Sequence, residues 1–260
     1  MTSQGNLIPV YKEFLCDTET PVSAYLKIKD KSFSYLLESA DGGKRWGRHT
    51  FIGYKPYLTI LSRDREMEVM EGAGKKILNN VRNPLNVLRK LSQQFKPVVV
   101  NDLPPFQGGF VGYFNYDLAR KWEYLPGISP ESAKVPECLF TVSRRLIIFD
   151  HLTHQIKVVA FAHVREHDNL KEIYDLTCQE IDKTIGELQS PLSSISGRDP
   201  FSSSDLEANF KRKDFEEVVR KAKDYIVAGD VVQVVLSQTF SGDVSGDDFT
   251  LYRNLTAELP

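Results

Sequence analysis

The segment LFTVSRRLIIFDHLTHQIKVVAFA, residues 139–162, decides the fold class of this chain. Its two halves, Leu139 to Asp150 and Gln155 to Ala162, are rich in β-branched and aromatic residues, and only the short turn HLTH separates them. Two such runs joined by a short turn are typical of an antiparallel hairpin. The segment therefore predicts an antiparallel sheet.

Further strands are predicted on the N-terminal side of this hairpin. Residues 33–39 alternate, so that Phe33, Tyr35, Leu37 and Ser39 share one face. Residues 50–60 form another strand, interrupted at Pro56, and the Gly-aromatic run 108–116 forms a third.

Helices are predicted around these strands. Thr20-Pro21 and Asn83-Pro84 each combine a capping residue with a proline, which is typical of the first turn of a helix. Leu170, Tyr174, Ile181 and Leu188 lie on the apolar face of a long third helix. Because helices alternate irregularly with strands, and hairpins outnumber crossovers, the sequence predicts an α+β fold of packed antiparallel β-sheets flanked by helices.

A Ser-rich linker divides the chain near its C-terminal end. Seven of the 17 residues in 189–205 are serine, and a new helix follows, with Asp214 and Glu217 spaced as a capping box and Gly229 as its end. Residues 231–240 are predicted as a central strand, and a last helix begins near Asp248. Because these elements cannot close a core, we expect a domain truncated at Pro260. The predicted domains are therefore an N-terminal region 1–188, a linker 189–208 and an incomplete domain 209–260.

Composition narrows the classes of function. Lys and Arg total 33 against 35 Asp and Glu, which argues against nucleic acid or an anionic membrane as the main partner. The chain has three cysteines, and no apolar run approaches the length of a membrane span. The N-terminus lacks the pattern of a signal peptide. These features predict a cytoplasmic enzyme or regulator.

Two motifs that suggest cofactor sites have simpler structural explanations. GGFVGYF, with Gly108, Gly109 and Gly112, lacks the spacing of a nucleotide-binding loop, and its glycines are expected to admit neighbouring backbone or large rings. Four histidines lie between His151 and His167, but the hairpin separates them, so no metal site is predicted.

The polar pair Glu38-Ser39, which follows Leu36 and Leu37 in SYLLES, has two interpretations. In the structural one, Ser39 bonds a nearby backbone group and Glu38 pairs with Lys44, Arg45 or Arg48. In the functional one, the pair and nearby backbone groups bind the ammonium and carboxylate of a small zwitterion, and the aromatic residues pack against its side chain.

Four segments, read together, resemble the large subunit, component I, of anthranilate synthase. They are TPVSAYLKI (residues 20–28), LLESADGGKRWGRHTFIG (36–53), GGFVGYFNYDLAR (108–120) and AKDYIVAGDVVQVVLSQTF (222–240). The resemblance extends from about Val10 to Pro260.

The resemblance implies that residues 1–188 are a regulatory region, that residues 209–260 begin a chorismate-binding catalytic domain, and that Leu37, Glu38 and Ser39 belong to a feedback site for tryptophan. It also implies that the full enzyme converts chorismate and ammonia, or glutamine through an amidotransferase subunit, to anthranilate and pyruvate. In the family, the catalytic residues, the Mg²⁺ ligands and an Asn-Pro-Ser-Pro-Tyr wall of the tryptophan pocket are expected beyond Pro260. We therefore assign no catalytic residue and no metal ligand to this chain, and expect it to be inactive alone.

Two alternatives remain open at this stage. Aminodeoxychorismate synthase component I, of folate biosynthesis, shares the fold and the AGDVVQVVLSQ-type segment, although the uninterrupted LLES stretch favours tryptophan biosynthesis. The chain could also be a non-catalytic module that binds an aromatic amino acid. The incomplete core after Asp214 argues against this second alternative.

Overall fold

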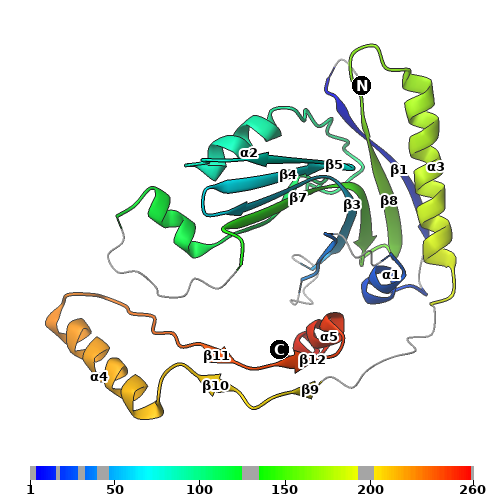
Figure 1. Ribbon diagram of the computed structural model, residues 1–260. Helices are drawn as coiled ribbons and strands as arrows, with labels where there is room; N and C mark the ends of the chain where they lie inside the picture. Colours follow the sequence, from blue (N-terminus) through cyan, green and yellow to red (C-terminus); the bar gives the residue numbers. More distant parts are fainter. Residues whose placement is uncertain are drawn as a thin grey trace. The chain divides into compact units, whose positions relative to one another are not determined.

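The computed structural model describes residues 4–15, 18–28, 33–39, 47–124, 135–192 and 202–258. The chain divides into an N-terminal unit, residues 1–193, and a C-terminal unit, residues 194–260 (Figure 1). The prediction of a regulatory region, a linker and a catalytic domain assigns functions to these parts of the chain, and it stays a prediction.

The N-terminal unit is built on one eight-stranded sheet in which all the strand pairs are antiparallel. Its strands are β1 (Leu7–Leu15), β2 (Tyr35–Leu37), β3 (His49–Arg63), β4 (Glu66–Glu71), β5 (Gly74–Leu78), β6 (Phe110–Phe114), β7 (Cys138–Asp150) and β8 (Gln155–His163). The predicted hairpin is confirmed as β7 and β8, with Asp150 paired to Gln155.

The two longest strands, β3 and β7, pair with each other, and each also pairs with two further strands. On β7, residues 138–142 pair with β6, whereas residues 145–150 pair with β8. On β3, residues 51–53 pair with β2 and residues 58–63 with β4. The sheet therefore has two halves that share β3 and β7, and Figure 1 shows β1 and β8 running in a different direction from β4 and β5.

The change of direction lies at an irregularity in β3. The β3–β7 register shifts between Pro56 and Leu58, and Lys55 has a φ of +50°. The predicted interruption at Pro56 is wrong, because β3 continues through the proline. A bulge explains this: it accommodates a residue that has no N–H to donate and bends the strand at the same point.

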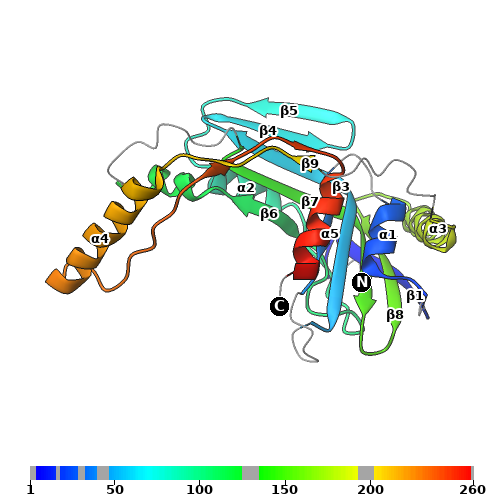
Figure 2. The ribbon, with the colours of Figure 1, turned by 90° about the horizontal axis from the view of Figure 1, so that it is seen from below.

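Helices cover both faces of this curled sheet, as Figure 2 shows from below. They are α1 (Pro21–Ile28), α2 (Pro84–Ser92) and α3 (Leu170–Gln189), and a short 3₁₀ helix spans Tyr116–Lys121. Alternate residues of β7 divide between the faces: Ile147 and Phe149 pack in a cluster with α1 and α3, whereas Leu146 and Ile148 pack on the opposite side. The predicted α+β class, with an antiparallel sheet flanked by helices, is confirmed.

Both predicted N-terminal caps are confirmed. The Ser23 amide donates to the Thr20 hydroxyl at 3.1 Å, and the Thr20 amide donates to the Ser23 hydroxyl at 2.9 Å. At α2, the Asn83 side chain accepts from the Leu85 amide at 3.0 Å. These bonds satisfy amides that have no partner within the first turn of a helix.

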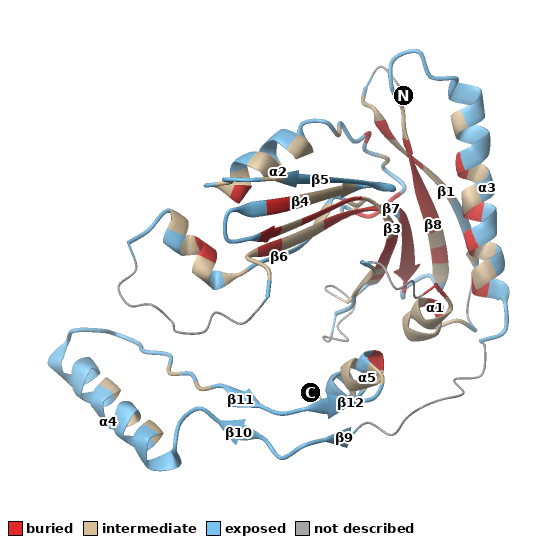
Figure 3. Ribbon diagram, viewed as in Figure 1, coloured by how far each residue is buried: buried red, intermediate tan, exposed pale blue. Residues whose placement is uncertain are grey.

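The apolar face predicted for α3 is correct only in its C-terminal half. Thr177, Ile181, Thr184 and Leu188 are buried at helical spacing (Figure 3). Leu170 and Tyr174 are exposed. The periodic pattern predicts the helix correctly, but only its C-terminal half is covered by other parts of the protein.

The C-terminal unit contains two helices and two small strand pairs. Its elements are β9 (Ser202–Ser203), β10 (Glu207–Ala208), α4 (Arg212–Ala228), β11 (Phe240–Ser241), β12 (Val244–Ser245) and α5 (Asp248–Glu258). Gly229 ends α4 with a φ of +81°, as predicted, and the helix predicted near Asp248 is confirmed.

Two predictions for this unit are wrong. The capping box at Asp214 does not form, because α4 begins at Arg212 and Asp214 lies inside its first turn, where the helix dipole favours a carboxylate. Residues 231–239 are not a strand, and Val232 is 97% exposed. A strand requires a ladder of hydrogen bonds. In the described part of the chain no residue of this segment belongs to one, although the Thr239 carbonyl accepts from the Asn209 amide at 3.0 Å.

Candidate functional site

The predicted site residues lie at the end of β2, next to the start of β3. Leu37 is the last residue of β2 and pairs with Phe51, and Glu38 and Ser39 follow it without strand structure. All three residues are exposed. Continued by two residues, the β2–β3 register would place Ser39 opposite His49. The three side chains thus lie next to one another at one end of the sheet.

The predicted strand from Phe33 to Ser39 is wrong in its extent. β2 contains only Tyr35–Leu37, and Phe33, with a φ of +24°, cannot continue it. The argument that a buried Ser39 hydroxyl needs a partner therefore does not apply, because Ser39 is exposed. Two of the proposed partners of Glu38, Lys44 and Arg45, lie outside the described residues.

Aromatic residues lie behind this strand end. The rings of Phe51 and Phe106 meet edge-to-face with centroids 4.9 Å apart, and both rings, like that of Tyr35, pack against one buried core cluster. A Cβ at Gly53 would come within 2.1 Å of the Tyr35 ring, so only glycine allows this ring to lie across β3. Burial raises the pKa of the Tyr35 hydroxyl.

A charged cluster that the sequence analysis missed lies beside the start of β3. Asp150, the last residue of β7, accepts from Arg48 Nε at 3.0 Å and from Arg48 Nη2 at 2.6 Å. It also accepts from the backbone amides of Leu152 and Thr153 in the following turn. These bonds hold the pKa of the Asp150 carboxyl well below its usual range, and the bond to Arg48 contributes most. Arg48, the third predicted partner of Glu38, thus binds Asp150.

The neighbouring histidines complete this cluster. His49 Nε2 lies 3.6 Å from the Asp150 carboxylate, and the Thr50 hydroxyl and the His151 ring are hydrogen-bonded at 2.8 Å. Burial lowers the pKa of His49, which favours the neutral form of this ring. The signal in the sequence was a single acidic residue that ends an apolar strand just before a polar turn.

We use the name strand-end cluster for a set of six neighbouring residues: Leu37, Glu38, Ser39, Arg48, His49 and Asp150. It combines carboxylates, a hydroxyl and a guanidinium next to a group of aromatic rings. Such a combination has the chemistry to hold both charged groups of an amino acid.

The structural explanation of GGFVGYF is supported. A Cβ at Gly112 would lie 1.9 Å from the Leu139 carbonyl oxygen of the paired strand β7. Gly108 has a φ of +97°, and a Cβ there would lie 2.9 Å from the Phe161 ring. These glycines admit a neighbouring backbone and a large ring, respectively.

Metal ligands do not converge in the part of the chain that the structure describes. Within it, no three His, Cys, Asp or Glu side chains are close enough together to hold a metal ion. In the same residues no helix has the length and apolar character needed to cross a membrane.

Comparison with known proteins identifies the family. The model for chorismate binding enzymes matches residues 5–260, and this chain therefore belongs to that family. The chain is 36% identical over 267 residues to anthranilate synthase component 1 of Synechocystis sp., a match that covers 98% of this chain and 52% of the relative. It is 35% identical over 259 residues to the component 1 of Aquifex aeolicus, with the same two coverages.

A solved structure supports the same relationship. The crystal structure of anthranilate synthase component I from Streptococcus pneumoniae TIGR4 superposes with a TM-score of 0.64 at 26% identity. The match covers 94% of this chain and 52% of the solved chain. The chain thus spans about half the length of the curated relatives it matches, and it corresponds to their N-terminal half.

Proposed function

We propose that this chain is the tryptophan-regulated portion of an anthranilate synthase component 1. The supporting observation is its match to component 1 proteins over 98% of its length. The complete cytoplasmic enzyme would aminate chorismate with ammonia, or with glutamine through an amidotransferase partner, and then eliminate pyruvate to leave anthranilate.

We place tryptophan binding at the strand-end cluster. Leu37, Glu38 and Ser39 are adjacent and exposed, so a ligand can reach them, and Arg48 and Asp150 bring further charge to the same end of the sheet. A carboxylate and a hydroxyl suit the ammonium of an amino acid, and a guanidinium suits its carboxylate. The nearby Phe51 and Phe106 rings suit an indole.

Feedback inhibition further requires that tryptophan bind two states of the enzyme unequally. A ligand held at the end of β2 contacts the start of β3, which runs through the bend into the other half of the sheet. Binding there can therefore favour one curvature of the sheet over another.

Catalysis is proposed to belong to residues outside this chain. By the resemblance, we infer that the chorismate site and the Mg²⁺ ligands lie beyond Pro260, and the described residues contain no cluster of three or more His, Cys, Asp or Glu side chains that could hold a metal ion. A polypeptide of residues 1–260 should show no chorismate turnover with any metal or ammonia source, and reproducible turnover would contradict this assignment.

Substitution of Ser39 tests the regulatory site. In the product of the complete reading frame, Ser39→Phe should relieve inhibition by tryptophan and leave uninhibited turnover nearly unchanged, because the bulky ring occupies the space of the ligand. Ser34→Phe is a suitable control, since Ser34 precedes β2 in the chain whereas Ser39 follows it. Inhibition of Ser39→Phe with the same midpoint as the unmodified enzyme would show that Ser39 has only a structural role.

A further inference from the structure

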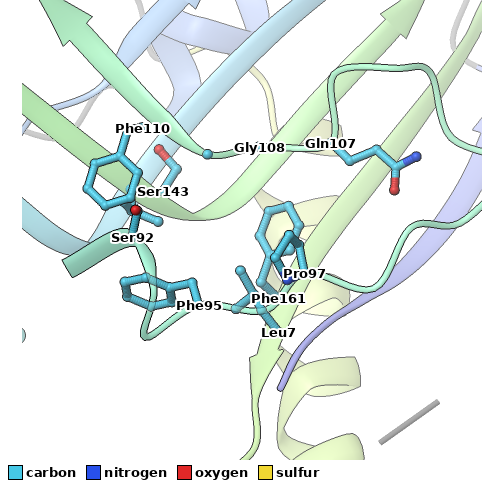
Figure 4. A pocket seen from close by; sticks show the side chains of 11 residues that line it. Leu7, Ser92, Phe95, Pro97, Gln107, Gly108, Phe110, Ser143 and Phe161 are labelled. Carbon is cyan, nitrogen blue, oxygen red and sulfur yellow. The ribbon is translucent and has the colours of Figure 1, made fainter. Parts of the chain in front are cut away.

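The fork between β6 and β8 contains a cavity that is separate from the strand-end cluster. Both strands pair with the same edge of β7, but β6 begins with Phe110 opposite Val142, and the pairing of β8 with β7 stops at Ala160 opposite Arg145. Ser143 and Arg144 fall between the two ladders, where the strands diverge. A cavity of about 210 Å³ opens at this fork (Figure 4).

The lining of this fork cavity is apolar and carries no charged side chain. Its apolar residues are Leu7, Phe95, Pro97, Phe110, Val142 and Phe161. The Cβ position of Gly109 faces open space, with no described atom within 4 Å, and the positive φ of Gly108 and Gly109 turns the chain at the rim. Pro97 and Gly109 are exposed, so the cavity is open to solvent.

Two of the three polar side chains in the lining are already occupied. The Gln107 amide bonds the backbone of Val100 through both its oxygen and its nitrogen, at 3.0 and 2.8 Å, and Figure 4 shows it turned away from the rings. The Ser92 hydroxyl donates to the Arg89 carbonyl at 2.9 Å.

Ser143 differs from these two side chains. It is 95% buried, since its exposed fraction is 5%, and its hydroxyl has no hydrogen-bond partner among the described residues. The Tyr35 hydroxyl lies close to it but outside hydrogen-bond geometry. A buried hydroxyl without a partner costs on the order of 1–3 kcal/mol, a cost that a ligand with one polar group would remove.

We propose that the fork cavity binds a neutral aromatic molecule of one or two rings, whose single polar N–H or O–H group bonds Ser143. An apolar cavity of about 150 Å³ already accepts benzene, so the volume here suits a slightly larger ring system. The absence of charge from the lining excludes a zwitterion or a carboxylate, whose desolvation nothing in the lining would offset. The ligand therefore differs from the one proposed for the strand-end cluster.

Binding of indole and of 1-methylindole to the protein tests the proposal. The two probes have similar shapes, but only indole can donate to the Ser143 oxygen. Ser143→Ala should weaken indole binding about fivefold, the equivalent of one neutral hydrogen bond, and leave 1-methylindole binding unchanged. Equal loss for both probes, or no saturable binding of indole to the unmodified protein, would overturn the proposal.

Filling the cavity gives a second test with a matched control. Ser92 is the last residue of α2, and Ser190 is the residue that follows α3. Each hydroxyl bonds the carbonyl three residues earlier, but only Ser92 lines the cavity. Ser92→Trp should abolish binding of both probes, and Ser190→Trp should not. If Ser92→Trp fails to fold, the methyl NMR signals of Leu7 and Val142 in the unmodified protein show whether indole binds in the cavity. These signals should shift with indole while that of Leu188 does not, and the opposite pattern contradicts the proposal.

Competition with L-tryptophan separates this site from the proposed regulatory one. Tryptophan should not displace indole from the fork cavity, and Ser39→Phe should leave indole binding unchanged. Displacement by tryptophan that Ser39→Phe removes would locate indole at the strand-end cluster instead, and would overturn the fork-cavity proposal while supporting the proposed function.

Discussion

Helices α3 and α4 have similar sequence patterns but very different surroundings. On α3, Ile181 is fully buried and Leu188 is 2% exposed, because the sheet and α1 cover them. On α4, Phe215, Val219 and Ile226 share one face, yet the helix has no buried residue. An amphipathic pattern thus specifies a helix and its apolar face, whereas burial requires a second surface, which α4 does not find among the described residues.

The largest expected effect contrasts the same substitution on the two helices. Ile181→Ala should lower the free energy of unfolding by about 2–5 kcal/mol, because it leaves a cavity in a packed core. Ile226→Ala should change it by less than about 0.5 kcal/mol, since Ile226 is 42% exposed. Denaturant unfolding of both variants measures the difference.

The product of the complete reading frame sharpens this contrast. There, Ile226→Ala should become clearly destabilising if further chain covers α4. Equal effects of the two substitutions in residues 1–260 would contradict the difference in surroundings that the structure shows.

Substitution of two glycines gives a similar contrast between a tightly packed position, Gly112, and an open one, Gly186. Gly112→Ala should cost about 2 kcal/mol, because the new Cβ would meet the Leu139 carbonyl oxygen across the β6–β7 ladder. Gly186→Ala, in α3, should instead stabilise by about 0.5–1 kcal/mol, since nothing lies within 4 Å and alanine favours a helix. Thermal unfolding of the two variants should therefore shift in opposite directions, and a shared direction would refute the assigned environments.

The smallest effect is expected at the strand-end cluster and depends on pH. The folded-state pKa of Asp150 lies below its unfolded value, so its contribution to stability is present above about pH 4 and is lost as pH falls through the folded pKa. Asp150→Asn should therefore destabilise the protein at pH 7, and the difference from the unmodified protein should shrink below pH 4.

A surface pair provides the control for this pH dependence. Asp182 pairs with Lys12, but both side chains are about half exposed. Asp182→Asn should have a smaller effect on unfolding at every pH. A gap between Asp150→Asn and the unmodified protein that stays constant from pH 7 to pH 2 would show that the Asp150 carboxylate does not contribute through its charge.

Local sequence signals predicted which helices, caps and turns form, but they did not predict how distant segments pair with one another. The β7–β8 hairpin, the Thr20 and Asn83 caps and the Gly229 stop depend on neighbouring residues, and all four are present. The continuity of β3 through Pro56 depends on its partner β7, which no local pattern reveals. Likewise, residues 231–239 have the composition of a strand, but the described residues offer them no ladder to join.

The candidate site was predictable only in part, for the same reason. Leu37, Glu38 and Ser39 are consecutive, so a motif could reveal them. Arg48 and Asp150 are about a hundred residues apart, and only the pairing of β3 with β7 brings them together. The Ser143 hydroxyl was not predictable either, since it depends on the fork between β6 and β8.

The most direct test of the proposed function is an assay of the complete reading frame for anthranilate. The purified product, given chorismate, ammonium and Mg²⁺, should form fluorescent anthranilate, and added tryptophan should suppress it. Accumulation of an aminated chorismate without anthranilate would contradict the account and indicate the folate-pathway enzyme. A reading frame that ends at Pro260 and gives no turnover would contradict it as well, and would leave a binding module as the remaining function.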